Sequence, residues 1–379
     1  MKAGLLYDQL GAEEYGILLA ADRVGVQVEA LNAKTLLFSS EFRAKHDVYI
    51  GRCKSVNRRM KLAELLENFG LSIINSHIVE KNCNDKSLTT ILFNRGGIPA
   101  PDTCFIPYNS IQDEKGRPFF RREELKEVVE KIESSLTYPM VVKPVLGSWG
   151  KQIRKIEDEK TLRRELMNNF PNMMNHVGFY VQKFIPKAFD VRAYVVVLDG
   201  DSRYITALAR VSPSDDKYVT NTAQGGMPVG LDVPNVLKRL LMRISETVAS
   251  DQKAALLAID VMPVMEDEEE RHRIYELHRQ LFRHFRKILS VQDRFFRGLS
   301  LTRERVEAAD RWLRGVFEDF KHHQTYGELK AAIEGQLREK PILSQEVNSN
   351  TDYWFGTRNV TGIDMGDYYV SCAVALRGG

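Results

Sequence analysis

The chain has 379 residues, which is too long for one small hydrophobic core and predicts two or three packed domains. With 43% hydrophobic residues, 28% charged residues and a net charge of +3, the composition is that of an ordinary soluble globular protein, and the charge balance alone implies neither nucleic-acid nor membrane binding. No apolar run reaches the length of a membrane span, and the start MKAGLLYDQL lacks the pattern of a secretory signal. Four scattered cysteines without a CxxC pair indicate free thiols in a reducing compartment, so we expect a cytoplasmic protein.

The first part of the chain alternates between strand and helix patterns. Gly70 follows an amphipathic run and is placed to end a helix there. The glycines of this part do not form GxGxxG, so a dinucleotide fingerprint is absent. The expected elements are strands at 2–7, 26–31, 47–50 and 72–75 and helices at 13–24 and 58–69.

A second unit begins at about Ile78. Asp85 lies at the start of a helix that runs to Phe93, where a carboxylate is favoured, and Asp199-Gly200 marks the turn of an antiparallel pair. The expected helices are 84–93, 123–134, 161–169 and 236–250, and the expected strands are 103–106, 138–143, 179–184, 190–199, 203–211 and 255–264.

The character of the sequence changes over residues 266–340, which are rich in Arg, Glu and His. Their apolar residues recur at helical spacing and predict two long helices and a shorter third at 329–337. A strand at 342–347 follows. We therefore expect a helical insertion between two strands that otherwise are hairpin neighbours.

One stretch, YPMVVKPVLGSWGK from Tyr138 to Lys151, combines a buried strand that carries Lys143 with a glycine-containing loop. Glycines let backbone N–H groups approach an anion, and a fixed cation beside such a loop suits a nucleoside triphosphate. The alternative for this stretch alone is a strand followed by an ordinary turn.

A second informative spot is Glu346-Val347-Asn348. Residues two apart on a strand share a face, so Glu346 and Asn348 present a carboxylate and an amide oxygen together. If the strand of Asp260 pairs with theirs, the three form a hard-oxygen site for Mg²⁺. The alternative is a set of solvated polar residues on the open face of an antiparallel sheet.

Taken together, these motifs resemble the ATP-grasp superfamily, and within it the RimK/LysX-type amino-acid ligases, over residues 1–265 and 341–375. The loop GSWG and the run NTAQGG look specifically like the LysX/ArgX branch. The motifs that occur in the family's order are LLYD, GRCKSVNRRMKLAELLENFGLSIIN, the helix start at Asp85-Lys86, VVKPVLGSWGK, QKFI, DVRAYVV, NTAQGG, AIDV and EVN.

The resemblance implies an α/β (α+β) ATP-grasp fold with an N-terminal pre-ATP-grasp domain, to which this chain adds the helical insertion. The expected parts are the pre-ATP-grasp domain at 1–77, a central subdomain with the glycine-rich lid at 78–180, a C-terminal subdomain at 181–265 and 341–379, and the insertion at 266–340.

The resemblance also implies roles for single residues. Alternatives remain open for some of them, since Arg192 and Arg210 also suit a strand surface and Lys86 a helix surface. The implied ATP-binding residues are Lys86, Lys143, Gly147, Ser148, Trp149, Gly150, Lys151, Gln182, Lys183, Phe184, Ile185 and Asp190, with Asp260, Glu346 and Asn348 on Mg²⁺, Arg192 and Arg210 at the acyl phosphate, and Asn221 beside the acceptor.

The implied reaction joins a carboxylate to an amine, with ATP, through an acyl phosphate. The implied metal is Mg²⁺, with Mn²⁺ as an alternative and two ions expected. The implied partners are an amino acid and a small acidic carrier protein or peptide ending in glutamate, with no membrane or nucleic acid and with a dimer or tetramer as the assembly. Alternatives are a RimK- or cofactor-type ligase that adds glutamate or another amino acid, a catalytically silent nucleotide sensor, and RNA binding by the Arg-rich helices.

Three departures from the family pattern limit what can be transferred. Many members carry two adjacent arginines where this chain has Arg210-Val211, and the run after EVN differs. The aromatic residues Tyr353, Trp354 and Phe355 in that run either line a pocket or pack a core. The insertion is either a docking surface for an acidic partner or a helical subdomain with a solvated charged face.

Overall fold

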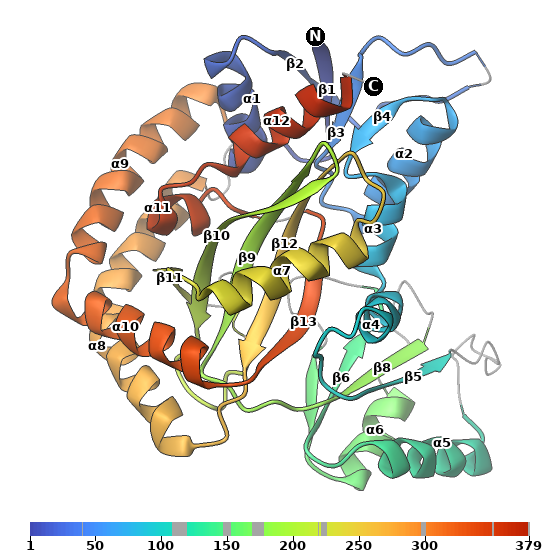
Figure 1. Cartoon of the computed structure of the whole chain (residues 1–379), viewed down its shortest axis with the longest axis vertical. Coiled ribbons are helices and arrows are strands. Elements are labelled where there is room, and N and C mark those ends of the chain that lie inside the picture. Colours follow the sequence, from blue (N-terminus) through green and yellow to red (C-terminus); the bar gives the residue numbers. More distant parts are fainter. Residues whose placement is uncertain are drawn as a thin grey trace.

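A computed structural model of the chain describes residues 1–39, 41–107, 120–146, 153–168, 178–218, 220, 226–296, 301–350 and 352–377, with the backbone alone for 291–296. Within these ranges the strands form three sheets, in the orders β2-β1-β3-β4, β5-β8-β6-β7 and β11-β10-β9-β12-β13. Figure 1 shows the first sheet at the top, the second at the bottom and the third between them.

The first sheet is parallel throughout and contains the predicted strands. It consists of β1 (Lys2–Tyr7), β2 (Gln27–Asn32), β3 (Val48–Gly51) and β4 (Ser72–Ile74), joined by α1 (Ala12–Arg23) and α2 (Val56–Asn68). Gly70 has a φ of +75° just after α2, which confirms its place at the end of that helix.

Two helices follow where the sequence predicted one. They are α3 (His77–Asn84) and α4 (Lys86–Arg95). Asp85 separates them and caps α4, since its side chain accepts hydrogen bonds from the backbone N–H groups of Ser87 and Leu88. The predicted start at Asp85 is confirmed, and α3 was missed.

The second sheet has a hydrophobic core of its own. Its order places β8 between β5 and β6, and the short strand β7 at one edge was not predicted. The elements are β5 (Thr103–Pro107), β6 (Met140–Pro144), β7 (Arg154–Ile156) and β8 (Gly178–Lys183), with α5 (Arg122–Ser135) and α6 (Glu159–Asn168).

The third sheet is antiparallel and forms the centre of the molecule. Its strands are β9 (Phe189–Leu198), β10 (Asp201–Val211), β11 (Met227–Leu231), β12 (Ala254–Pro263) and β13 (Ile342–Asn348), and β11 was not predicted. Asp199 and Gly200 both have positive φ, as a tight β9–β10 turn requires. Every residue of β12 is buried, so both faces of the sheet are covered there, and α7 (Asn235–Val248) packs against it.

The helical insertion lies between β12 and β13, as predicted. Its helices are α8 (Glu268–Phe296), α9 (Arg303–Lys321) and α10 (Gln324–Glu339), and they stand together on one side of the third sheet (Figure 1). Strands β12 and β13 pair directly as antiparallel neighbours, which confirms that the insertion replaces a hairpin loop.

The last part of the chain returns to the first sheet. After α11 (Thr357–Thr361), helix α12 (Met365–Arg377) packs against α1 and against β12, so the described ends of the chain lie close together (Figure 1). Tyr353, Trp354 and Phe355 are buried in the same core, at 0%, 2% and 8% exposure, which decides between the two alternatives in favour of packing.

The three sheets support our division of the chain into four parts, which stays a proposal. The proposed boundary at residue 180 falls inside β8, whose whole length pairs with the second sheet. Among the described residues, we find no helix with the length and apolar character needed to cross a bilayer.

Candidate active site

A row of charged side chains crosses one face of the third sheet. The pairing places Arg210 of β10 opposite Asp190 of β9, and Arg192 of β9 opposite Asp260 of β12. Because residues two apart on a strand share a face, Asp190 and Arg192 bring these pairs side by side. Glu346 of β13 continues the row opposite Asp260, as the sequence predicted for this pairing.

Arg192 and Asp260 form a two-pronged ion pair. The Nε and Nη2 atoms of Arg192 donate to the two carboxylate oxygens of Asp260 at 2.8 and 2.7 Å. Burial alone raises the pKa of Asp260, but Arg192 and Arg210 hold it below its ordinary value. Asp260 is therefore a carboxylate at neutral pH although none of it is exposed.

Arg210 bridges the two aspartates of the row. It donates to both oxygens of Asp190 at 2.7 and 2.8 Å and to Asp260 at 3.0 Å. Lys187 adds a third cation, with its Nζ 3.2 Å from Asp190. Burial raises the pKa of Asp190, yet Arg210 and Lys187 bring it below its ordinary value, so the pairs are charged.

Lys143 reaches this region from β6 of the second sheet. It is 7% exposed, and its Nζ donates to Oε1 of Gln182 on β8 at 2.8 Å. Burial lowers the pKa of Lys143 to about 8, Glu346 opposes that shift, and Lys86 and Lys187 add to it. Lys143 is therefore close to the cations and carboxylates of the third sheet, although it lies on a different sheet.

Lys86 is the first residue of α4 and lies beside the strand of Lys143. Its backbone N–H donates to the carbonyl of Val145 at 3.2 Å, and Asp85 forms a β-bridge with Leu146. Burial lowers the pKa of the Lys86 amine, while Glu346 and Asp85 oppose the shift. The start of α4 is thus fixed to the segment that leads into the predicted lid.

Asp260, Glu346 and Asn348 fit a hard divalent cation by their chemistry. Within the described ranges the side chain of Glu346 forms no ion pair or hydrogen bond, so its carboxylate oxygens are available. The amide nitrogen of Asn348 lies 3.3 Å from Asp260, and turning that amide over presents its oxygen instead. Two carboxylates and an amide oxygen are ligands that Mg²⁺ prefers.

The net charge of the region favours an anionic ligand. If Asp85 is left out because it caps α4, five cationic side chains face three carboxylates among the described residues, an excess of two positive charges. Burial disfavours the charged form of an amine, and it lowers the pKa values of Lys86 and Lys143. The cations are Lys86, Lys143, Lys187, Arg192 and Arg210, and the carboxylates are Asp190, Asp260 and Glu346.

The predicted hinge, Gln182 to Ile185, lies at the end of β8. The backbone N–H groups of Lys183 and Phe184 donate to Asp102 and Pro139. In the part of the chain that is described, the N–H of Ile185 has no such partner. The predicted lid residues Gly147, Ser148, Trp149, Gly150 and Lys151, and Asn221 beside the acceptor, lie outside the described residues.

Sequence reasoning missed two residues that contact the carboxylate of Asp190, Lys187 and Thr220. The hydroxyl of Thr220 hydrogen-bonds to Asp190, and Lys187 lies within hydrogen-bond distance of Asp190, Thr220 and Gln345. Both lie in loops without apolar periodicity. A signal existed for Lys187, because it stands between the recognised runs QKFI and DVR.

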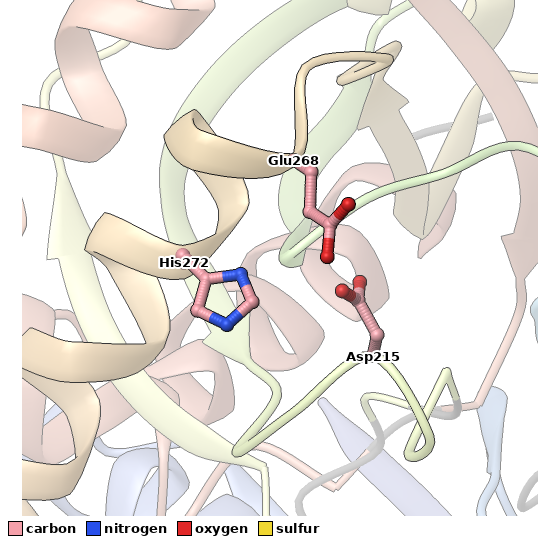
Figure 2. A group of neighbouring side chains, drawn as sticks. All are labelled: Asp215, Glu268 and His272. Atoms are coloured by element: carbon pink, nitrogen blue, oxygen red, sulfur yellow. The ribbon is translucent and has the colours of Figure 1, made fainter.

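A separate cluster lies where the insertion meets the loop after β10. Figure 2 shows the side chains of Asp215, Glu268 and His272 facing one another, with ligand-type atoms within 4.8 Å of each other. Asp215 already accepts hydrogen bonds from Arg271 at 2.9 Å and from the Tyr275 hydroxyl at 2.8 Å. A guanidinium at this distance opposes a bound cation, so we assign the cluster to anchoring α8.

Two family models match consecutive parts of the chain. A LysX preATP-grasp domain matches residues 3–81, and a RimK-like ATP-grasp domain matches residues 84–268. The second match contains Lys86, Lys143 and the Asp190-to-Asp260 part of the charged row.

The chain belongs to the RimK/LysX family of ATP-grasp ligases. It is an ATP-dependent ligase that forms carbon–nitrogen bonds, and the family uses ATP with Mg²⁺.

Curated relatives of this ligase are 28% and 29% identical to it over the aligned residues. The alpha-aminoadipate–LysW ligase LysX of Saccharolobus solfataricus is 28% identical over 243 residues, 62% of this chain and 79% of that protein. The glutamate–LysW ligase ArgX of Sulfolobus acidocaldarius is 29% identical over 268 residues, 69% of this chain and 85% of that protein.

Solved structures agree on the fold. The ATP-grasp ligase PsnB, in a complex with a phosphomimetic variant of its minimal precursor, Mg and ADP, superposes with a TM-score of 0.55 at 11% identity over 99% of this chain and 98% of that one. A RimK domain protein of Sphaerobacter thermophilus gives a TM-score of 0.50 at 18% identity over 70% of this chain and 87% of that one. The ATP-grasp fold predicted from the motifs is confirmed.

Proposed function

We propose that the ligase activates a carboxylate of a protein or peptide acceptor as an acyl phosphate and couples it to an amino acid, in the charged row around Arg192 and Asp260. A carboxylate oxygen attacks the γ-phosphorus of ATP, and ADP leaves. The amino group of the second substrate then attacks the acyl carbon, the carbon–oxygen bond breaks, and inorganic phosphate leaves with one oxygen of the original carboxylate. One row of fixed, fully charged side chains next to Lys143 is the observation that carries this proposal.

Arg192 and Arg210 are the groups that meet the transferring phosphoryl group. Burial alone lowers the pKa of Arg210, but Asp190 and Asp260 keep it raised, so the guanidinium keeps its charge in a dry site. Both aspartates hold the guanidinium groups in place before the substrates bind. Fixed donors of this kind stabilise developing negative charge without reorganising during the reaction.

The second sheet supplies the nucleotide side of the site. Lys143 and Lys86 contact phosphates, and the excess positive charge around them supports this role. The resemblance implies that residues 147–151 are the lid for the triphosphate, and the N–H of Ile185 would bind the adenine. Both oxygens of Asp190 contact cations, so this carboxylate orders Arg210 and Lys187. The resemblance implies a further role for Asp190 near the ribose.

Asp260, Glu346 and Asn348 hold Mg²⁺, with two ions as our proposal and Mn²⁺ as an alternative. When it is bound, the metal supplies charge neutralisation between the phosphate oxygens. Glu346 lies in the middle of the site, since it attracts both Lys86 and Lys143. The carboxylate therefore separates the cations of the nucleotide side from the arginines of the third sheet.

The acceptor that fits the relatives is a small carrier protein. LysX and ArgX are named as ligases that act on LysW with alpha-aminoadipate and with glutamate. We propose a carrier of this kind, ending in glutamate, as the activated carboxylate, and an amino acid as the amine. The departure after Asn348, where Tyr353 to Phe355 pack the core, leaves the identity of the amino acid to experiment. A dimer or tetramer stays our prediction.

The test is an ADP-release assay with Mg-ATP over a panel of amino acids, with and without a glutamate-terminated carrier, followed by mass spectrometry. We expect ADP only when both substrates are present, and a carrier whose mass grows by one amino acid less water. ADP formed with free amino acids or small cofactors alone contradicts the carrier and favours a small-molecule or RimK-type ligase. Tight Mg-ATP binding without turnover across the panel contradicts the reaction and favours a nucleotide sensor.

A further inference from the structure

The exposed face of α8 is strongly basic. Five cations lie on it within about half of the helix, and Glu276 is the one acidic residue between the first and the last of them. We call this set the basic stripe: Arg273, Arg279, Arg283, Arg286 and Lys287, all exposed. The whole chain has a net charge of only +3, so this concentration is local.

The stripe differs from the other two helices of the insertion. On α9 and α10 several cations pair with acidic residues one turn away, as in Arg303–Glu307, Arg314–Asp310 and Lys330–Glu334. In the described part of the chain, none of the five stripe residues forms an ion pair.

Like charges repeat along the stripe. Arg279 and Arg283 are four residues apart, and so are Arg283 and Lys287, a spacing at which like charges destabilise a helix. A face kept only for solvation has no need of this arrangement, because alternating charges solvate equally well and stabilise the helix. The pattern therefore indicates a surface that meets negative charge from outside.

The basic stripe starts beside the active site. Arg271 and the Tyr275 hydroxyl donate to Asp215 of the loop after β10, and the Tyr275 oxygen lies 3.3 Å from the carbonyl oxygen of Lys187. Lys187 itself contacts Asp190 of the charged row. The first two turns of α8 are thus tied to the segment beside Asp190, and the helix continues from there along one side of the third sheet (Figure 1).

An aromatic residue interrupts the cations. Phe282 lies between Arg279 and Arg283 in the sequence and is 38% exposed. Arg and aromatic side chains are the types enriched at protein–protein interfaces, where the ring gives apolar contact and the guanidinium pairs with carboxylates. A polyphosphate chain gains little from an exposed Phe edge, and the acidic first turn Glu268 to Glu270 repels it.

We propose that the basic stripe of α8 docks an acidic segment of the protein acceptor and directs its terminal carboxylate to the charged row. The inference rests on the proposed function in that it takes the acceptor to be a protein or peptide. It adds the surface that binds this acceptor and the sign of its charge. The contact is electrostatic and close to the site, so it raises the local concentration of the reacting carboxylate.

The experiment compares two triple variants that change the net charge equally. Arg279→Glu/Arg283→Glu/Arg286→Glu reverses the stripe, and Arg122→Glu/Arg164→Glu/Arg239→Glu reverses exposed cations on α5, α6 and α7. The probes are a fluorescein-labelled poly-L-glutamate peptide and a labelled single-stranded RNA of equal charge, and binding to the full-length enzyme is read by fluorescence anisotropy at low and high salt. ADP release by the native enzyme with the amino-acid panel and the glutamate-terminated carrier reports the chemistry separately.

We expect the stripe variant to bind the peptide about tenfold more weakly or worse at low salt, the control variant to bind as the native enzyme does, and salt to abolish the difference. Equal weakening by both variants, no weakening by the stripe variant, or tighter binding of the RNA than of the peptide overturns the proposal. Absence of ADP release by the native enzyme with the carrier contradicts the proposed function alone, because the anisotropy measurement requires no turnover.

Discussion

Arg192 and Asp260 face each other across β9 and β12 with two parallel hydrogen bonds of 2.8 and 2.7 Å, in a region where Asp260 has no exposed surface. Arg210 of β10 donates to the same carboxylate at 3.0 Å. Asp260 therefore connects the two arginines. Loss of its carboxylate affects both the stability of the fold and the charges available to the substrates.

Replacing Asp260 by Asn keeps the volume of the side chain and removes its charge. Arg192 and Arg210 then lose a buried counter-charge, and we expect the free energy of unfolding measured in urea to fall by about 3 kcal/mol. ADP formation should fall by a factor of about 100 or more. In a double-mutant cycle with Arg192→Met, the two losses should not add.

The control for this cycle is the exposed pair Asp201 and Arg203, whose charges lie 3.9 Å apart on β10. Asp201→Asn and Arg203→Met should each change stability by less than about 0.5 kcal/mol. If the losses at Asp260 and Arg192 add, the two residues do not act as one unit.

Lys143 gives the site a pH dependence above neutrality. Burial lowers the pKa of Lys143 to about 8, so the free enzyme loses this charge as the pH rises through that value. An anionic nucleotide binds the protonated form better, so the affinity for Mg-ADP should fall about tenfold per pH unit above pH 8. Calorimetric titration between pH 7 and pH 9 measures this change.

The matched variant is Lys143→Arg, which keeps its charge over the whole range. It should lose most of the pH dependence, with a remainder from Lys86, whose pKa is also lowered by burial. An unchanged pH profile in Lys143→Arg shows that another group is responsible.

His278 on α8 gives the stability of the fold a pH dependence below neutrality. Its side chain is 1% exposed, and neither ring nitrogen has a hydrogen-bond partner among the described residues. Burial lowers the pKa of His278 to about 4. Arg279 and Lys217 face it and lower the pKa further. Since the folded pKa is below the unfolded value, the unfolded chain binds this proton first, and stability is lost as the pH falls from about 6.5 towards 4.

The loss between pH 7 and pH 5 should be about 2 kcal/mol for this residue. The variant His278→Leu should lack that part of the pH dependence, which urea unfolding at the two pH values measures. The exposed His272 offers a control, because His272→Leu should leave the dependence in place. Equal pH dependence in the native chain and His278→Leu contradicts the burial of a neutral imidazole.

The packing of the C-terminal aromatics depends on a glycine in α1. A Cβ at Gly16 lies 2.6 Å from the ring of Trp354 and 2.9 Å from the hydroxyl of Tyr353. Gly16→Ala should therefore lower stability by about 1–3 kcal/mol even though alanine favours helices. Gly315→Ala on α9, where a Cβ meets nothing, should be neutral or stabilising, and a loss as large as that of Gly16→Ala contradicts this account of the core.

Much of the site could be predicted because strand periodicity and motif order both bear on it. Asp260, Glu346 and Asn348 stand on strands whose side chains alternate, so pairing of the strands was enough to bring them together. Lys187 could not be found this way, because it lies in a loop and reaches Asp190 through a tertiary contact.

The misses in the fold have physical reasons as well. Helices α3 and α4 are separated by Asp85 alone, so the apolar pattern shows no break between them. Strands β7 and β11 are short, with three and five residues, and give little periodicity. Whether Trp354 lines a pocket or packs a core depends on α1, which lies more than 300 residues away in the sequence.

The most direct test of the account follows one oxygen atom. The acceptor carboxylate is labelled with ¹⁸O, the amide is formed with Mg-ATP and the amino acid, and the released phosphate is analysed by mass spectrometry. We predict that each phosphate carries one labelled oxygen and that label transfer keeps pace with amide formation, because the carboxylate oxygen leaves with the phosphate. Unlabelled phosphate released together with ADP and amide contradicts the acyl phosphate, and with it the role of Arg192 and Asp260 in carboxylate activation.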